Sequence, residues 1–178
     1  MRILVAITGA SGLQYGVKLV QTLKEMKQDI KVIVSSGAKK VADAEGVNLP
    51  KADYEEIDFS CPYASGSNPP DAMIVVPCSL KSLGEISNGV GDALITRAAE
   101  VVLKERKKLI LVVRETPYSL ITIKNMELVT LAGGIVLPAT PGFYGKPKTI
   151  DDMIDFVVAR ILDQVGIKNE IGKRWGSQ

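Results

Sequence analysis

Histidine is absent from this chain of 178 residues. Without it the protein has neither the commonest general base nor a Ser-His-Asp or Cys-His nucleophile system, and no histidine can bind zinc or iron. We therefore expect proton transfers to fall to Glu, Asp, Lys, Tyr, Cys, a ligand or a cofactor. We expect no metal.

Cysteines and long apolar runs are also scarce. The two cysteines, Cys61 and Cys78, are too far apart for a CxxC motif and too few for a disulfide framework, which favours two reduced thiols. An apolar run such as Ile3 to Ile7 is far shorter than a membrane span, and the turn Thr8 to Gly12 follows it directly, where a signal peptide would continue. We predict a cytoplasmic protein with no membrane segment.

The charge is nearly balanced, with 22 Lys and Arg against 20 Asp and Glu. A net charge of +2 gives no broad positive surface, so we expect no nucleic-acid partner. With 46% hydrophobic and 24% charged residues, the composition is that of an ordinary globular protein. We predict a single domain over residues 1–178, with 166–178 as a C-terminal tail.

Apolar segments of two kinds alternate along the chain. Short continuous runs predict strands at 3–7, 30–34, 72–76, 109–113 and 134–137, the third of them stopped by Pro77. Helical spacing predicts helices at 12–27, 39–45 and 150–165, and another that starts at an Asp92 N-cap and runs to Lys108. This alternation indicates an α/β fold with a doubly wound parallel sheet.

Ligands of such sheets bind beyond the carboxyl ends of the strands, and the loops expected there are polar or rich in glycine. They are Thr8 to Gly12, Ser35 to Gly37, Pro77 to Ser82, Arg114 to Pro117 and Pro138 to Pro147.

The first loop only partly resembles a dinucleotide-binding motif. Ser11 stands where GxGxxG has its second glycine, and Ser35 stands where an acidic residue would hold a ribose, so NAD is disfavoured. The absence of GxxxxGK[ST] disfavours nucleotide hydrolysis. Small hydroxyl groups and helix N-termini suit one phosphate and a flat ring, as in FMN. Alternatively, Gly9 and Gly12 only form a tight turn between strand and helix.

Several longer segments resemble those of UbiX-type flavin prenyltransferases, in the same order along nearly the whole chain. The segments are 8–16, 64–67, 77–79, 97–106, 113–117, 141–144 and 155–162, with Arg174-Trp175 at the end. The resemblance implies a three-layer, Rossmann-like (flavodoxin-like) fold. It also implies an enzyme that joins a dimethylallyl group from dimethylallyl phosphate to N5 and C6 of reduced FMN. The prenylated flavin then serves a separate decarboxylase, and the resemblance points to a homododecamer.

The resemblance also implies roles for individual residues. Those expected to contact FMN are Gly9, Ala10, Ser11, Ser35, Ser79, Leu80, Lys81, Ser82, Arg97 and Arg114. Those expected around the dimethylallyl phosphate are Lys104, Arg114, Tyr144 and Arg160. Glu115, Glu45 and Ser11 are expected near the reacting atoms.

Allyl transfer needs cations for the departing phosphate, an electron-rich and dry surround for the allyl group, and a base. The phosphate itself is an alternative base. Lys104 alternatively belongs to a solvated basic helix end, and Arg160 to a surface salt bridge with Asp163. Two other functions remain open: a non-catalytic FMN carrier, and a flavin-dependent cysteine decarboxylase, which the missing histidine disfavours.

Overall fold

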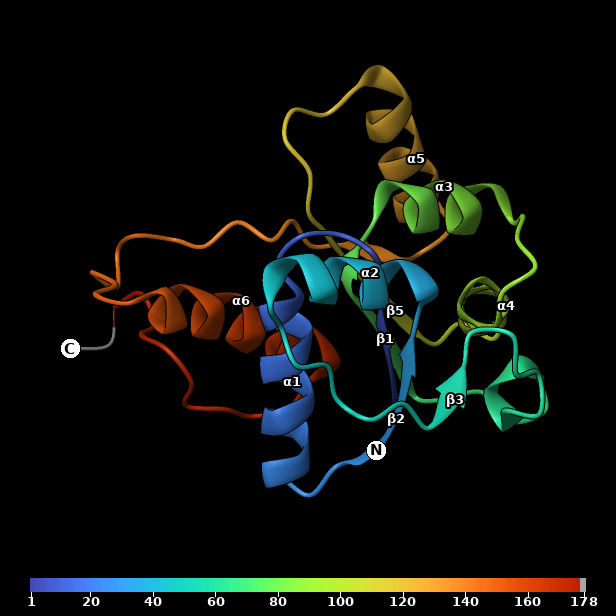
Figure 1. Cartoon of the computed structure of the whole chain (residues 1–178), viewed down its shortest axis with the longest axis horizontal. Coiled ribbons are helices and arrows are strands. Elements are labelled where there is room, and N and C mark those ends of the chain that lie inside the picture. The colour runs from blue at the N-terminus through green and yellow to red at the C-terminus, as the bar shows by residue number, and fades with distance from the viewer. Residues whose placement is uncertain (177–178) are drawn as a thin grey trace.

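The computed structural model, which describes residues 1–176, shows a six-stranded parallel sheet (Figure 1). The strands are β1 (Arg2–Ile7), β2 (Asp29–Val34), β3 (Tyr54–Glu55), β4 (Ala72–Cys78), β5 (Lys108–Val113) and β6 (Ile135–Val136). Their order across the sheet is β3-β2-β1-β4-β5-β6. β1 lies near the centre, where Val5 pairs with Val32 on one side and Ile74 on the other.

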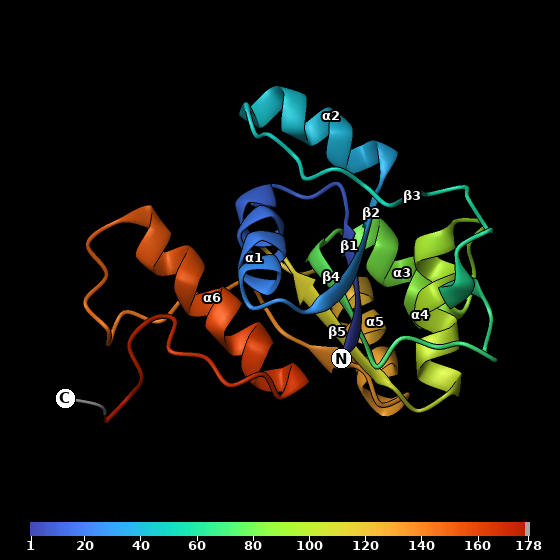
Figure 2. The ribbon, with the colours of Figure 1, turned by 90° about the horizontal axis from the view of Figure 1, so that it is seen from below.

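Helices cover both faces of this sheet (Figure 2). They are α1 (Leu13–Glu25), α2 (Ser36–Glu45), α3 (Leu80–Asn88), α4 (Leu94–Lys104), α5 (Leu120–Leu131) and α6 (Ile150–Val165), with a 3₁₀ turn η1 (Pro62–Ala64). Alternate residues of each strand point to opposite faces. Ile3, Val5 and Ile7 pack with α1 and α6, whereas Leu4 and Ala6 pack with α3 and α4. The three-layer, doubly wound α/β fold is thus confirmed.

Two expected boundaries are wrong. Asp92 is not the N-cap of α4, because the helix has Ala93 at its N-cap, and Leu94 donates its backbone N–H to the Glu56 carbonyl at 2.7 Å. A contact distant in sequence therefore sets where the helix begins. It also ends at Lys104 rather than Lys108, since Arg106 has a φ of 55°, outside the helical range.

The third expected strand continues beyond its predicted stop. β4 passes through Pro77 to Cys78, and its pairing with β5 shifts register between Val75 and Cys78. Proline has no backbone N–H to donate to the neighbouring strand, and the irregular pairing at this position accommodates that missing hydrogen bond.

Two helices, α3 and α5, had no counterpart among the helix ranges predicted from the sequence. α5 carries apolar residues around its whole circumference, so no helical period stands out in its sequence. Leu120, Ile121 and Leu131 are more than 70% exposed.

The C-terminal segment returns along α6. From Gly166 to Gly176 the described residues form neither helix nor strand, and residues 177 and 178 of the expected tail lie outside the described part. None of the helices within residues 1–176 is both long and apolar enough to cross a membrane.

Candidate functional site

The loop between β1 and α1 lies where the chain order reverses across the sheet, which is the usual ligand position in doubly wound folds. Buried Thr8 ties this loop to the end of β4. Its hydroxyl donates to the Pro77 carbonyl at 2.8 Å and accepts the Ser79 backbone N–H at 2.8 Å. The first and third loops of the carboxyl edge are therefore held together.

Gly9 brings the same loop against the start of α2. A Cβ atom placed on Gly9 would lie 2.8 Å from the carbonyl carbon of Gly37, a distance that real Cβ atoms do not adopt. Only glycine at position 9 permits this close backbone approach.

A cavity of about 340 Å³ opens beside these loops. Its lining includes Gly9, Ser35, Ser79, Leu80, Lys81 and Ser82, all expected to contact FMN. Ser35 and Ser79 cap α2 and α3, because their hydroxyls accept the backbone N–H groups of Ala38 at 3.0 Å and Ser82 at 3.2 Å. Two helix N-termini thus reach one cavity, an arrangement that favours an anion.

Charged side chains of both signs line this cavity. Lys40 and Lys81 are accompanied by Glu56 and Glu85, and Lys81 pairs with Glu85 at 3.3 Å. The Glu56 carboxylate accepts the backbone N–H of Ser36 at the start of α2. That N–H group therefore already binds a negatively charged oxygen in this structure.

Four further predicted residues, Ala10, Ser11, Glu45 and Arg114, lie on the β1–α1 loop or contact it. Arg114, directly after β5, donates from Nε to the Ser11 carbonyl at 3.1 Å. The Gly12 backbone N–H lies 3.4 Å from a carboxylate oxygen of Glu45, the last residue of α2. Ala10 is buried within the loop, whereas Ser11 is exposed.

Glu115 follows Arg114 at the same edge and is half-buried. Its Oε1 accepts the backbone N–H of Thr116 at 2.9 Å, so its side chain folds over the next turn. No ion pair between Glu115 and Arg114 occurs in residues 1–176.

Arg97 is not among the residues that line the cavity, although its neighbours Ile95 and Thr96 are. Its Nε donates to the Ala64 carbonyl at 3.0 Å, and its Nη1 pairs with Glu100 at 2.8 Å.

The residues expected to hold the donor phosphate are dispersed within one chain. Lys104 ends α4, before β5 begins, and pairs with Glu105 far from the carboxyl edge. Tyr144 and Arg160 line a separate cavity of about 290 Å³ between α6 and the C-terminal segment. Arg160 forms the ion pair with Asp163 that was the alternative interpretation of the sequence, at 2.9 Å. Only Arg114 lies at the β1–α1 loop.

The cysteines do not contribute a reactive group. Cys61 and Cys78 are free and buried, and burial raises the pKa of the Cys78 thiol far above its ordinary value. Within residues 1–176, Cys, Asp and Glu form no cluster that could hold a metal ion.

The sequence analysis missed several residues that line the cavity of about 340 Å³ beside Gly9, notably Lys40, Glu56 and Glu85. Glu56 follows β3, a two-residue strand that is too short to give an alternating pattern. The signal for Lys40 and Glu85 was their position within the first two turns of helices that begin at the ligand edge.

Comparison with known proteins extends over nearly the whole chain. The sequence profile of the Flavoprotein family matches residues 1–162. A relative from Thermoplasma acidophilum, the flavin prenyltransferase UbiX, is 48% identical over 98% of this chain and 100% of its own.

Two solved structures are closely similar. The crystal structure of AnUbiX (PadA1) in complex with FMN and dimethylallyl pyrophosphate has a TM-score of 0.94 and 40% identity, covering 99% of this chain and 98% of that one. A dodecameric FMN-dependent UbiX-like decarboxylase from Escherichia coli O157:H7 has a TM-score of 0.92 and 40% identity, covering 99% and 100%. Together with a glycine-lined cavity at the switch point of the sheet, these likenesses show that the chain belongs to the UbiX family of flavin prenyltransferases.

Proposed function

We propose that this protein is a flavin prenyltransferase, which joins the dimethylallyl group of dimethylallyl phosphate to N5 and C6 of reduced FMN. The observation that carries the proposal is the cavity of about 340 Å³ beside the Gly9–Gly37 contact, in a chain of this family. Reduced FMN supplies the electron-rich nitrogen and carbon that accept the allyl group.

The residues that line the cavity of about 340 Å³ fit a flavin mononucleotide. Glycine backbone lets a flat ring approach the β1–α1 loop, while Ser35, Ser79 and Ser82 offer hydroxyls beside two helix N-termini for one phosphate. Strand β2 ends at Val34 and is followed by Ser35 rather than an acid, which disfavours NAD. The full set of proposed FMN contacts is Gly9, Ala10, Ser11, Ser35, Ser79 to Ser82, Arg97 and Arg114.

Cations would stabilise the charge that develops on the departing phosphate. The proposed donor ligands are Lys104, Arg114, Tyr144 and Arg160. Because these residues are dispersed in one chain, we propose that neighbouring copies complete each pocket, in a homododecamer like that of the E. coli relative. The exposed apolar side chains of α5 support burial against another copy.

Proton transfers in a site without histidine would fall to Glu115, Glu45, the Ser11 hydroxyl or the phosphate released from the donor. Glu115 is suitably placed because one carboxylate oxygen accepts the Thr116 N–H and the other has no hydrogen bond within residues 1–176. The Ser11 hydroxyl is exposed at the loop and is proposed to lie near N5.

The product would pass to a separate decarboxylase that uses prenylated FMN. We also propose that residues 1–178 form one flavoprotein domain with 166–178 as its tail. The two free, buried thiols support a cytoplasmic location.

One experiment tests the proposed activity. Reduced FMN is incubated anaerobically with the full-length protein and dimethylallyl phosphate, and the extracted flavin is weighed by mass spectrometry. We expect the flavin to gain one prenyl unit, and parallel samples with the pyrophosphate compare the two donors. An FMN carrier would retain flavin of unchanged mass with either donor, which would contradict the proposal.

A further inference from the structure

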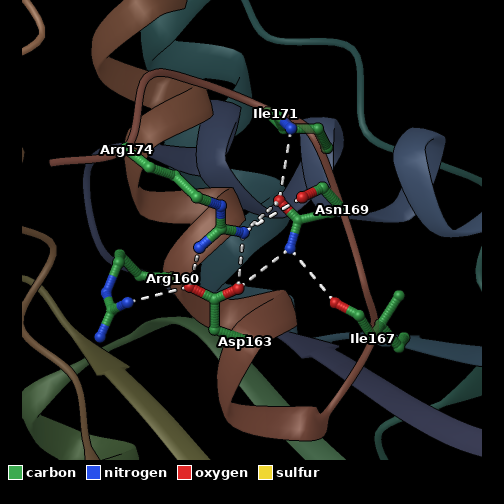
Figure 3. Close-up of polar contacts among 6 residues, drawn as sticks. All are labelled: Arg160, Asp163, Ile167, Asn169, Ile171 and Arg174. Atoms are coloured by element: carbon green, nitrogen blue, oxygen red, sulfur yellow. Dashed lines mark hydrogen bonds and ion pairs between the residues drawn. The ribbon is translucent and has the colours of Figure 1, made fainter. Parts of the chain in front are cut away.

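A closed polar network lies at the cavity that holds Tyr144 and Arg160 (Figure 3). At its centre is Asp163, whose side chain is only 21% exposed. Arg160, one turn earlier on α6, donates from Nη1 to Asp163 Oδ2 at 2.9 Å. Arg174 from the C-terminal segment donates through both terminal nitrogens, at 3.0 Å to Oδ2 and 2.9 Å to Oδ1.

Asn169 joins the C-terminal segment to this network through hydrogen bonds. Its amide nitrogen donates to Asp163 Oδ1 and to the Ile167 carbonyl, both at 3.2 Å. Its backbone carbonyl accepts from Arg174 at 3.1 Å, and its side-chain oxygen accepts the Ile171 N–H at 3.3 Å. The hydrogen bonds from Arg174 hold the pKa of the Asp163 carboxyl below its ordinary value, with smaller contributions from Asn169 and Arg160. The carboxylate is therefore ionised at neutral pH.

Arg160 is held by one nitrogen, whereas Arg174 is held by two. Within residues 1–176, Nη1 is the one nitrogen of Arg160 that makes a hydrogen bond, and the rest of its guanidinium lies away from Arg174 (Figure 3). Two guanidinium groups share a single carboxylate, so the network keeps an excess positive charge beside the cavity. A guanidinium with a free edge and excess positive charge suits an incoming phosphate.

We propose that Asp163, occupied on both oxygens by Arg174, is the positioning residue that presents the free edge of Arg160 to the donor phosphate. This inference rests on the proposed function. If Arg174 were removed, Asp163 would keep only the Asn169 hydrogen bond on Oδ1 besides Arg160, and the Arg160 fork would then close on the carboxylate and turn from the ligand.

The same segment reaches the second proposed donor ligand. The ring of Trp175, next to Arg174, packs edge-on against Tyr144, with ring centroids 5.4 Å apart. Trp175 thus contacts Tyr144 directly, and Arg174 reaches Arg160 through Asp163.

The test compares Arg174→Gln with Lys168→Gln in the full-length protein loaded with FMN. Both variants lose one positive charge from the same segment, but Lys168 is exposed and makes no polar contact within residues 1–176. We measure kcat and KM for dimethylallyl phosphate, inhibition by inorganic phosphate, and FMN content. Arg174→Gln should raise KM about fivefold and weaken phosphate inhibition by the same factor, with kcat and FMN content retained. Lys168→Gln should match the wild type, and Arg174→Lys should be intermediate.

The outcomes separate the inference from the activity on which it rests. If the wild type prenylates FMN but Arg174→Gln behaves as Lys168→Gln does, the positioning role is refuted and the proposed function stands. A loss of FMN content and kcat at unchanged KM would show a structural role and also refute it. If the wild type neither prenylates FMN nor binds the donor, both proposals fail. Should Arg174→Gln not fold, Arg174→Lys decides, and an unchanged KM in it overturns the inference.

Discussion

Because no histidine is present, we propose that acid-base chemistry in this protein falls to individual carboxylates, the Ser11 hydroxyl or the released phosphate. Glu115 is at the carboxyl edge next to Arg114, yet these two side chains point to different partners: Thr116 N–H and the Ser11 carbonyl. The Glu115 side chain is consequently not neutralised by its neighbour, and a proton-transfer role remains compatible with its geometry.

Replacing Glu115 by Gln should retain the fold and FMN binding, because the amide oxygen can still accept the Thr116 N–H. The amide cannot readily take or release a proton, and loss of such help typically slows a step by about 10² to 10⁴-fold. We expect single-turnover formation of prenylated flavin to slow at least tens of times, with Glu170→Gln, an exposed carboxylate, as the control. An unchanged rate would assign the proton to Glu45 or to the phosphate.

Gly9→Ala tests the close approach of two loops. The added methyl would meet the backbone of Gly37 at 2.8 Å, so one loop must shift, at a cost of about 1 to 3 kcal/mol. We expect a lower melting temperature and weaker FMN binding in a fluorescence titration. Gly84→Ala, within helix α3, is the matched control, since its methyl would lie 3.6 Å from the nearest side-chain atom, Asn125 Nδ2, which is an ordinary van der Waals contact. Equal FMN affinity in the two variants would contradict the contact.

Among the secondary-structure elements, α6 has one end whose contacts are local in sequence and another whose contacts are tertiary. Its N-terminus is a capping box in which Thr149 Oγ1 accepts the Asp152 N–H at 3.1 Å and Asp152 accepts the Thr149 N–H at 2.9 Å. Near its other end lie Arg160 and Asp163, and Asp163 is joined to Arg174, 11 positions later in the C-terminal segment. The position at which α6 begins is therefore determined by neighbouring residues in the sequence. The contacts of Arg160 and Asp163 depend instead on the tertiary fold.

The capping box predicts a dependence of stability on pH. Backbone hydrogen bonds from Lys148 and Thr149 lower the pKa of Asp152 below its ordinary value of 3.8. Because the pKa of Asp152 is lower in the folded than in the unfolded protein, its ionised carboxylate stabilises the fold at pH values above the pKa in the unfolded chain. This stabilisation is lost as the pH falls through the pKa in the folded protein. Asp152→Asn should thus be less stable than the wild type at pH 7, and the difference should shrink below about pH 4. Asp151→Asn is the control, and urea unfolding at several pH values is the measurement.

For the whole molecule, the distribution of apolar surface and of proposed ligands points beyond one chain. α5 exposes Leu120, Ile121 and Leu131 at 71%, 74% and 77%. Lys104 and Arg114 lie at opposite ends of the sheet. Association of identical copies in a closed, symmetric assembly would bury the apolar side chains of α5. It would also bring Lys104 of one copy close to Arg114 of another.

Ile121→Glu should therefore shift the mass in light scattering from a closed oligomer to smaller species, since a buried unpaired charge is costly. Prenylation should fall with the loss of assembly. Ile121→Val, which keeps an apolar side chain, should retain both the mass and the activity. A wild-type mass of 19.1 kDa together with full activity would refute the shared pocket.

Much of the architecture could be predicted because it depends on local pattern. Continuous apolar runs such as Ile3 to Ile7 indicate buried parallel strands, and the polar loops that follow them indicate the ligand edge. The prediction was wrong where distant contacts decide, as at Leu94, and it missed α5, whose apolar residues show no helical period.

The amino-acid sequence by itself determined the α/β class, the ligand edge and the exclusion of histidine chemistry, since these follow from residue type and short-range order. Only the tertiary structure decided which side chains share a cavity. Gly9 meets Gly37, Arg114 reaches the Ser11 carbonyl across 103 positions, and Asp163 joins Arg160 to Arg174. Such pairings depend on how strands and helices cross in space, and spacing along the chain does not encode that directly.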